Sequence, residues 1–157
     1  MSAICRMRRL PAVAARGFML LEVLVAVLVF SLGVLALVGL QATAVRMSTD
    51  ARDRATATFL ADQLLGRMLI SDPATAASFA HLPNGNAACN PGGAASANPV
   101  VTGWLAEVAA QLPNAPAAQQ QIVVDAATGL VTVRLCWQNG NDPARSLTFV
   151  NQVQWQT

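Results

Sequence analysis

A single carboxylate, Glu22, lies inside a long apolar run and is the most distinctive chemical group in this sequence. Residues 18 to 40 read FMLLEVLVAVLVFSLGVLALVGL, and Glu22 is the only charged residue among them. A carboxylate inside a membrane-spanning helix costs about 2.5–3.5 kcal/mol on insertion scales, and such a residue usually has a function and a partner. We therefore treat Glu22 as a candidate functional residue.

A positively charged partner for this carboxylate arises if a peptidase cuts between Gly17 and Phe18. The cut would create a new α-amine at Phe18, and Glu22 would become the fifth residue of the shortened chain. In an array of parallel, staggered helices, the amine of one chain can meet the carboxylate of its neighbour, so that both charges are paired in an apolar core. The spacing thus predicts an assembly contact that sets the register between subunits.

The cysteines are the next candidates. Cys5 lies in the expected leader, which leaves Cys89 and Cys136 as a pair in the shortened chain. An even pair in an exported domain favours a disulfide, and two buried free thiols are the alternative. We expect no metal site, because no CxxC motif or Cys/His cluster accompanies the pair.

The remaining reactive side chains form no catalytic pattern. His81 is the only histidine, and we expect it at the surface of a loop. Asp125 and Asp142 occupy turn positions, where a carboxylate commonly accepts hydrogen bonds from the backbone. We find no Ser/His/Asp set, Cys/His pair or phosphate-binding loop, so the sequence predicts neither an enzyme nor a cofactor.

The charges are distributed unevenly along the 157 residues. All ten basic residues are arginines, four of them fall within the first 16 positions, and all eight acidic residues follow Gly17. Without residues 1–17, six arginines face eight acids, a balance of −2 that argues against nucleic acid as a partner. Only 11% of residues are charged, against about 25% in an ordinary globular domain.

The element that must position Glu22 is a helix over residues 18–41. At about 1.5 Å per residue it would span roughly 34 Å, enough to cross the ~30 Å core of a bilayer. Four arginines precede this helix, whereas the arginines after it are diluted by Asp50 and Asp53. The positive-inside rule then predicts a cytoplasmic N-terminus and an exported C-terminal region.

Two simpler interpretations compete with this one. In the first, the apolar run is a secretory signal peptide that is cut after Ala42-Thr43-Ala44. Such h-regions normally have about 7–15 residues and no acid, whereas this run is longer and contains Glu22. In the second, the run is a plain membrane anchor, which explains its length and orientation but not the glutamate.

The rest of the chain predicts a small α+β domain. An amphipathic helix half is expected over 42–72, ended by Ser71-Asp72-Pro73, with Arg52, Asp53 and Arg67 in solvent. Its expected core stripe is Val45, Ala55, Phe59, Leu60, Leu64, Met68 and Leu69. The globular head over 73–157 is expected to contain a loop at 73–99 pinned by Cys89, a helix at 101–112, and strands near 120–125, 130–138 and 146–155, which form a three-stranded antiparallel sheet packed on the long helix.

The apolar spacing also predicts one shared face in two of these elements. In the helix at 101–112 that face holds Val101, Trp104, Leu105, Val108 and Leu112. In the strand near 130–138 it holds Val131, Val133, Leu135 and Trp137.

The segment around Glu22 resembles a known family. Arg16-Gly17-Phe18-Met19-Leu20-Leu21-Glu22-Val23 resembles the type III signal sequence of type IV prepilins and of type II secretion pseudopilins. The resemblance implies that residues 1–17 are a leader peptide, that a prepilin peptidase cuts after Gly17 and methylates the amine of Phe18, and that Glu22 is the assembly glutamate.

The likeness is more specific further along the helix. The segments 21–26 and 33–41, LEVLVA and GVLALVGLQ, resemble the minor pilins known as type IV pilus modification protein PilV, and residues 57–68 also fit that family. The clear resemblance covers about residues 14 to 72. It implies a pilin-like fold and a minor pilin that takes part in initiation, assembly or tip structure of the pilus.

The resemblance also implies partners and a location. The partners would be the prepilin peptidase, other minor pilins, the major pilin, the inner-membrane assembly platform and, before assembly, membrane lipid. The chain would be a single-pass inner-membrane protein with a periplasmic head, and later part of the pilus at the cell surface.

Two alternative functions remain open. The first alternative is a type II secretion pseudopilin. The second is a tip subunit for adhesion or DNA uptake that would use the loops at 73–99 and 139–145.

Overall fold

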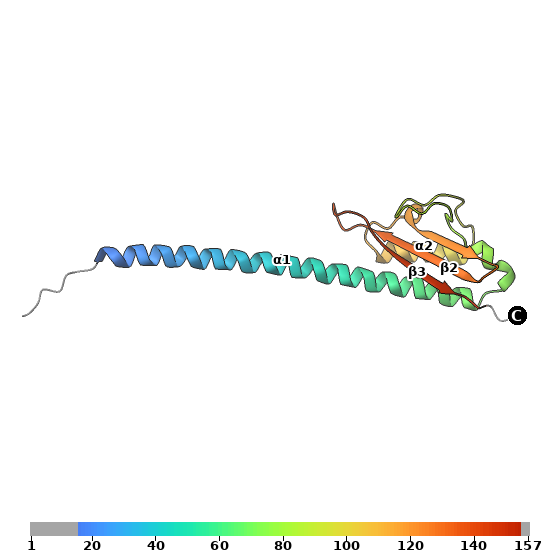
Figure 1. Cartoon of the computed structure of the whole chain (residues 1–157), viewed down its shortest axis with the longest axis horizontal. Coiled ribbons are helices and arrows are strands. Elements are labelled where there is room, and N and C mark those ends of the chain that lie inside the picture. Colours follow the sequence, from blue (N-terminus) through green and yellow to red (C-terminus); the bar gives the residue numbers. More distant parts are fainter. Residues whose placement is uncertain (1–15, 155–157) are drawn as a thin grey trace, which may run out of the picture. The chain divides into compact units, whose positions relative to one another are not determined.

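The computed structural model describes the backbone of residues 16–154 and the side chains of residues 19–154 (Figure 1). Residues 1–15 of the expected leader, including Cys5, and Trp155 at the end of the third expected strand lie outside the described residues, as do the side chains of residues 16–18. The elements in chain order are α1 (Arg16–Leu69), the 3₁₀ helix η1 (Pro73–Phe79), α2 (Pro99–Gln111), the 3₁₀ helix η2 (Ala117–Gln119), β1 (Gln121–Asp125), β2 (Leu130–Trp137) and β3 (Arg145–Gln152).

The chain divides into two compact units, Met1–Met47 and Ser48–Thr157. In the first unit, every described side chain belongs to α1 and is exposed. The second unit, called the head below, holds the rest of α1 and all the other elements. The predicted α+β class is confirmed, because a long N-terminal helix packs on a three-stranded antiparallel sheet.

The sheet has the order β1-β2-β3, and both pairs are antiparallel. Its central strand alternates as predicted, because successive side chains of a strand point to opposite faces. Val131, Val133, Leu135 and Trp137 are fully buried on one face, in one cluster with residues of α1 and α2. β-branched and aromatic residues favour such a half-buried pleated surface.

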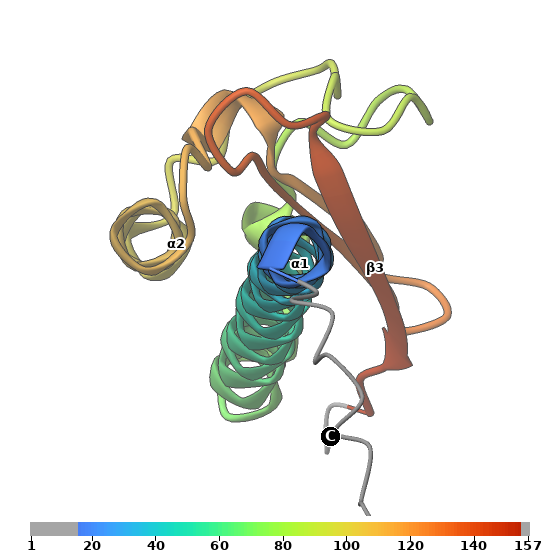
Figure 2. The same cartoon turned by 90° about the vertical axis from the view of Figure 1, so that its left-hand side faces the viewer.

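The core of the head lies where the sheet and α2 meet α1, which runs between α2 and β3 (Figure 2). Helix α2 buries the face predicted for it, with Val101, Trp104 and Val108 fully inside. The indole N–H of Trp104 donates to the backbone oxygen of Leu60 at 2.7 Å. This bond satisfies the polar end of a buried aromatic side chain and ties α2 to α1.

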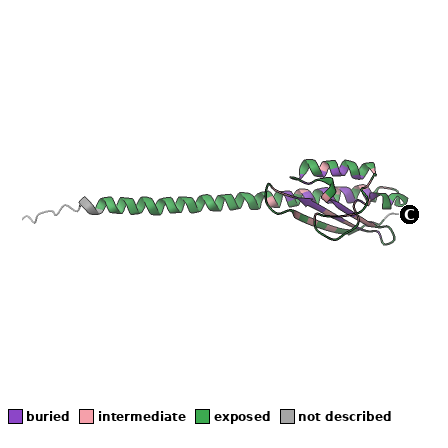
Figure 3. Cartoon of the chain, turned by 90° about the horizontal axis from the view of Figure 1, so that it is seen from above, coloured by how far each residue is buried: buried purple, intermediate pink, exposed green. Residues whose placement is uncertain are grey.

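The predicted core stripe of α1 is only partly correct. Val45, Ala55, Phe59 and Leu69 are exposed. Residues three or four apart share a helix face, and Phe59 is rotated about 100° from Leu60, out of the region that the sheet and α2 cover. The buried apolar residues of α1 are Ala57, Leu60, Ala61, Leu64, Leu65 and Met68. Figure 3 shows the buried colour on the part of the helix that belongs to the head.

The segment expected to be a loop at 73–99 contains regular structure. Asp72 caps η1, because its carboxylate accepts from the backbone N–H of Ala74 at 2.9 Å, and Pro73 fits the first turn of the helix, where its missing N–H costs nothing. Asn98 caps α2 in the same way, through the N–H of Val100. The proline that was expected to end a helix therefore also begins the next one.

The third strand is shorter than predicted. β3 ends at Gln152, and Val153, which follows it, donates its N–H to the backbone oxygen of Gly129 at 2.8 Å. Gly129 lies at φ 73°, and a Cβ at this position would collide with the backbone oxygen of Val153. The turn between β1 and β2 therefore needs a glycine for two reasons, its left-handed conformation and this close approach.

Candidate assembly site

The structure places Gly17, Phe18 and Glu22 in one helix, because α1 begins at Arg16. A cut after Gly17 would therefore make Phe18 the first residue of α1, at the end where the helix dipole is positive. Phe18 and Glu22 are four positions apart, which puts them on one side of the helix, one turn apart.

The carboxylate of Glu22 is exposed and has no cationic neighbour among the side chains described. The next charged residue along α1 is Arg46, which lies 24 positions further on, about 36 Å along a helix axis. The hydroxyl of Ser31 in this stretch donates to the backbone oxygen of Val27 at 2.7 Å, so it is satisfied within the helix. Glu22 is thus the one polar side chain from Met19 to Leu40 that needs a partner from outside these residues.

The first unit has the composition of a membrane span. Among the described residues, one helix is long and apolar enough to cross a membrane, and its apolar window lies near the N-terminus and is entirely unburied. By length and composition it fits a single span or a signal anchor. No protein-family model, curated protein or solved structure matches the chain.

In the head, the predicted pair Cys89 and Cys136 forms a disulfide, with the two Cα atoms 5.5 Å apart. Cys136 is fully buried in β2, and Cys89 lies in the loop before α2 at φ 61°. The side-chain amide of Gln120 accepts from the N–H of Cys136 at 2.8 Å and donates to its backbone oxygen at 2.9 Å. No sequence pattern predicted this contact, which holds the end of β2 next to the disulfide.

Two further side chains hold the loop that carries Cys89. The amide nitrogen of Gln121 donates to the backbone oxygens of Leu82, Asn84 and Gly85 at 2.9–3.2 Å. The guanidinium of Arg134 donates to the backbone oxygen of Asn86 at 3.2 Å. The loop is therefore attached to the sheet by side-chain hydrogen bonds as well as by the disulfide.

The expectation that His81 lies at the surface is wrong. Only 3% of the residue is exposed, and it forms a β-bridge with Ile122. Its Nδ1 accepts from the N–H of Ser96 at 3.1 Å, so Nε2 carries the proton and donates to the backbone oxygen of Ala117 at 3.0 Å. The ring thus connects the segment of His81 to the loop at Ser96 and to the start of η2 at Ala117.

Ion pairs join the start of the head to its sheet. Asp50 pairs with Arg54 on α1 at 3.1 Å and with Arg145, the first residue of β3, at 2.9 Å. Asp53 was expected in solvent, but only 8% of it is exposed, and it accepts from the side-chain nitrogen of Asn139 at 2.6 Å. The turn between β2 and β3 therefore docks on α1, which buries a carboxylate that the sequence pattern places on the polar face.

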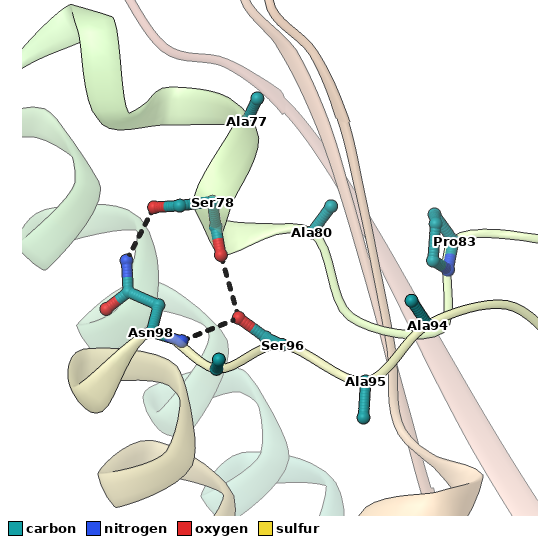
Figure 4. Close-up of a pocket in the computed structure, with 9 residues that line it drawn as sticks. Ala77, Ser78, Ala80, Pro83, Ala94, Ala95, Ser96 and Asn98 are labelled. Atoms are coloured by element: carbon teal, nitrogen blue, oxygen red, sulfur yellow. Dashed lines mark hydrogen bonds between the residues drawn. The ribbon is translucent and has the colours of Figure 1, made fainter.

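The head has several surface hollows. One of about 370 Å³ is lined by alanines, Pro83 and three polar residues, Ser78, Ser96 and Asn98, that bond to one another (Figure 4). No titratable side chain lines it. Within the part of the chain that the structure describes, no three His, Cys, Asp or Glu residues are grouped to hold a metal ion.

The turn between β1 and β2 carries a perturbed carboxyl group. The hydroxyl of Thr128 donates to Asp125 at 2.7 Å and the N–H of Ala127 at 3.0 Å, and both bonds lower the pKa of Asp125. A lowered pKa stabilises the fold above the pKa of the unfolded chain, and this contribution is lost as the pH falls through the folded value.

Asp125→Asn is expected to make thermal stability less dependent on pH below about pH 4. Melting curves from neutral to acid pH test this, and Asp62→Asn on the exposed side of α1 is the control that should retain the wild-type profile.

Proposed function

We propose that this chain is a minor type IV pilin that takes part in initiation, assembly or tip structure of the pilus. The observation that carries the proposal is the exposed apolar part of α1, in which Glu22 is the only charged side chain from Met19 to Leu40. Such a surface needs lipid or other apolar helices around it, and its carboxylate needs a cation.

The proposed pairing meets both needs. Cutting after Gly17 places the methylated amine of Phe18 at the positive end of α1, and the amine of one subunit would meet Glu22 of a neighbour. At a separation of about 4 Å and an effective dielectric constant near 20, two unit charges attract by about 4 kcal/mol. Because a misplaced subunit would leave both charges unpaired, the pair selects one axial register as well as adding affinity.

The head supports an exported location. The Cys89–Cys136 disulfide is typical of oxidising compartments such as the periplasm, and the arginines before α1 favour a cytoplasmic N-terminus. The partners we propose are the prepilin peptidase, other minor pilins, the major pilin and the inner-membrane assembly platform, with membrane lipid around α1 before assembly.

The N-terminal mass of the protein purified from membranes tests the first step. We expect a chain that begins at N-methylated Phe18. Gly17→Val is expected to block cleavage, because the leaders that this segment resembles end in Gly and a branched side chain would obstruct the cut, and the full leader should remain. A chain that begins after Ala44, or one that retains Met1 in the wild type, would contradict the proposal, and so would efficient processing of Gly17→Val.

A type II secretion pseudopilin is the second candidate, since the same leader and glutamate would serve it. The segment Gly39-Leu40-Gln41 at the end of the apolar run favours the pilus system. Deletion of the gene separates the two: loss of surface pili with normal enzyme secretion supports the pilin, and the reverse supports the pseudopilin.

A further inference from the structure

The sheet of the head has an open edge at β3. In the order β1-β2-β3 this strand pairs only with β2, and no other described element pairs with its outer side. All eight residues of β3 are in register with β2, from Arg145 opposite Trp137 to Gln152 opposite Leu130, without a bulge.

The contacts of Gln120 show which backbone groups face outward. Since Gln120 bonds both the N–H and the oxygen of Cys136, the backbone of Cys136 faces the β1 side. In an antiparallel sheet this direction alternates from residue to residue, so Leu135 and Val133 face β3. Their β3 partners are Leu147 and Phe149. The outward N–H and C=O groups therefore belong to the alternate residues of β3, namely Ser146, Thr148 and Val150.

The opposite edge of the sheet is occupied. The N–H of Ile122 in β1 donates to the backbone oxygen of His81 at 2.9 Å, and the oxygen of Ile122 accepts from the N–H of His81 at 3.0 Å. The ring of His81 is itself fixed on both sides, to Ser96 and Ala117. A strand from outside the head could therefore hydrogen-bond to the free backbone groups of β3, but not to those of Ile122, which are already bonded to His81.

The usual protections of an edge strand are missing from β3. Natural edges are blunted by lysine, proline, bulges, inward-pointing charges or a very short strand. Residues 146–152 read SLTFVNQ, with neither charge nor proline. The only charged residue, Arg145, is held at the start of the strand by Asp50. Ser146, Thr148 and Val150 also present exposed side chains, and 61% of Val150 is accessible.

We propose that the outer edge of β3 accepts an extended, uncharged segment of a different polypeptide as a fourth strand. The free N–H and C=O groups at every second residue require a β-conformation in the partner. The side chains of residues 146–152 are neutral, and the guanidinium that contacts them, that of Arg134, is already engaged by the hydroxyl of Thr148 at 3.3 Å and the backbone oxygen of Asn86 at 3.2 Å. An uncharged partner segment with β-branched or small residues therefore fits this edge best.

A second copy fits this edge less well. Its β1 edge is blocked at Ile122 by His81, so the longest open edge that it offers is its own β3. An antiparallel pair of two β3 strands, related by a two-fold axis through the sheet, would reverse the direction of the helix that packs along the sheet. The parts of α1 inside the two heads would then run in opposite directions, which does not suit two subunits side by side in the proposed pilus; this last point rests on the proposed function.

The test uses the full chain in the cells that produce it, with a photo-reactive amino acid in place of Ser146. Irradiation is expected to give a cross-link to another polypeptide. In the purified cross-linked complex, exchange of the amide hydrogens of Thr148 and Val150 should be at least ten-fold slower than in the free chain in micelles. The amides of Leu147 and Phe149, already bonded to β2, should be slow in both.

Matched variants at Val150 separate strand addition from other contacts. Val150→Pro removes an outward N–H without removing a bond to β2, and it should lower the cross-link yield at least ten-fold. Val150→Thr keeps the N–H and should retain the yield. Val150→Lys keeps the ladder but adds a charge at the edge, and it provides the loss-of-binding test if the proline variant does not fold.

Three outcomes would overturn the proposal: a product of twice the mass of the chain, equal yields in the three variants, or unprotected amides at Thr148 and Val150. The result is independent of the proposed function. An uncut leader together with protected edge amides would refute the pilin assignment alone, whereas methylated Phe18 with unprotected amides would refute the fourth strand alone.

Discussion

Glu22→Ala is expected to leave processing and membrane insertion intact and to lower incorporation into pili by about 100-fold or more. Breaking a buried ion pair by removing one partner costs about 3–5 kcal/mol, because the other charge is left without compensation. Here the uncompensated charge would be the amine of a neighbouring Phe18. The ratio of this subunit in sheared pili to that in membranes, measured by quantitative immunoblotting, gives the effect.

Two variants define the cause of that loss. Glu22→Gln keeps the shape of the side chain without its charge and should be impaired to a similar degree. Ser31→Ala removes a hydroxyl that is satisfied by Val27 within the same helix and should behave as wild type. Normal amounts of the Glu22→Ala subunit in pili would refute the pairing mechanism, even if the N-terminus is methylated.

Removal of the disulfide is expected to give the largest loss of head stability. The Cys89→Ser/Cys136→Ala double variant opens a loop that spans a sequence separation of 47. In the chain-entropy model this costs about 4 kcal/mol, equivalent to a melting temperature roughly 10–20 °C lower for a domain of this size. Circular dichroism of the purified chain in micelles measures the change.

Reduction of the wild type should reproduce the effect of the double variant, since both release the loop at Cys89. In the uncleaved chain, Cys5→Ser should leave the melting temperature unchanged, because Cys5 takes no part in the pair. A double variant that melts within about 2 °C of the wild type would show that the hydrogen bonds from Gln121 and Arg134 hold the loop by themselves.

Local rules predicted much of the head. Alternating apolar residues identified β2 and its buried face, and the apolar spacing from Val101 to Leu112 identified the buried face of α2. These patterns are reliable because, in a strand or helix that buries one face, the apolar residues must recur with the period of that element. The predicted strand positions differ from the structure by only a few residues, most of all at the end of β3.

The errors concern contacts between segments that are distant in the sequence. His81, in an expected loop, bonds to Ser96 and Ala117, and Asp53, on an expected polar face, bonds to Asn139, 86 positions away. Sequence periodicity carries no information about such partners, because it reflects only whether a face is covered. The same limit applies to Phe59, which is apolar but lies outside the area that the sheet and α2 cover.

The candidate site was predicted from residue types alone, since Glu22 is conspicuous as a charge among apolar residues. The structure adds that Phe18 and Glu22 share one continuous helix and that no described cation lies near the carboxylate. The sequence could not reveal which backbone groups lie on the open edge of β3, because this depends on the register between β2 and β3. The contact of Gln120 with Cys136 shows it only in the structure.

The full burial of Trp104 and Trp137 also has an optical consequence. The sequence contains no tyrosine, and its three tryptophans all belong to the head. Intrinsic fluorescence therefore reports on the head alone, whatever lipid or detergent surrounds the apolar part of α1. Because two of the three indoles are shielded from water in the folded head, unfolding should shift the emission to longer wavelengths. The folding of the head can thus be followed in vesicles without a dye or a label.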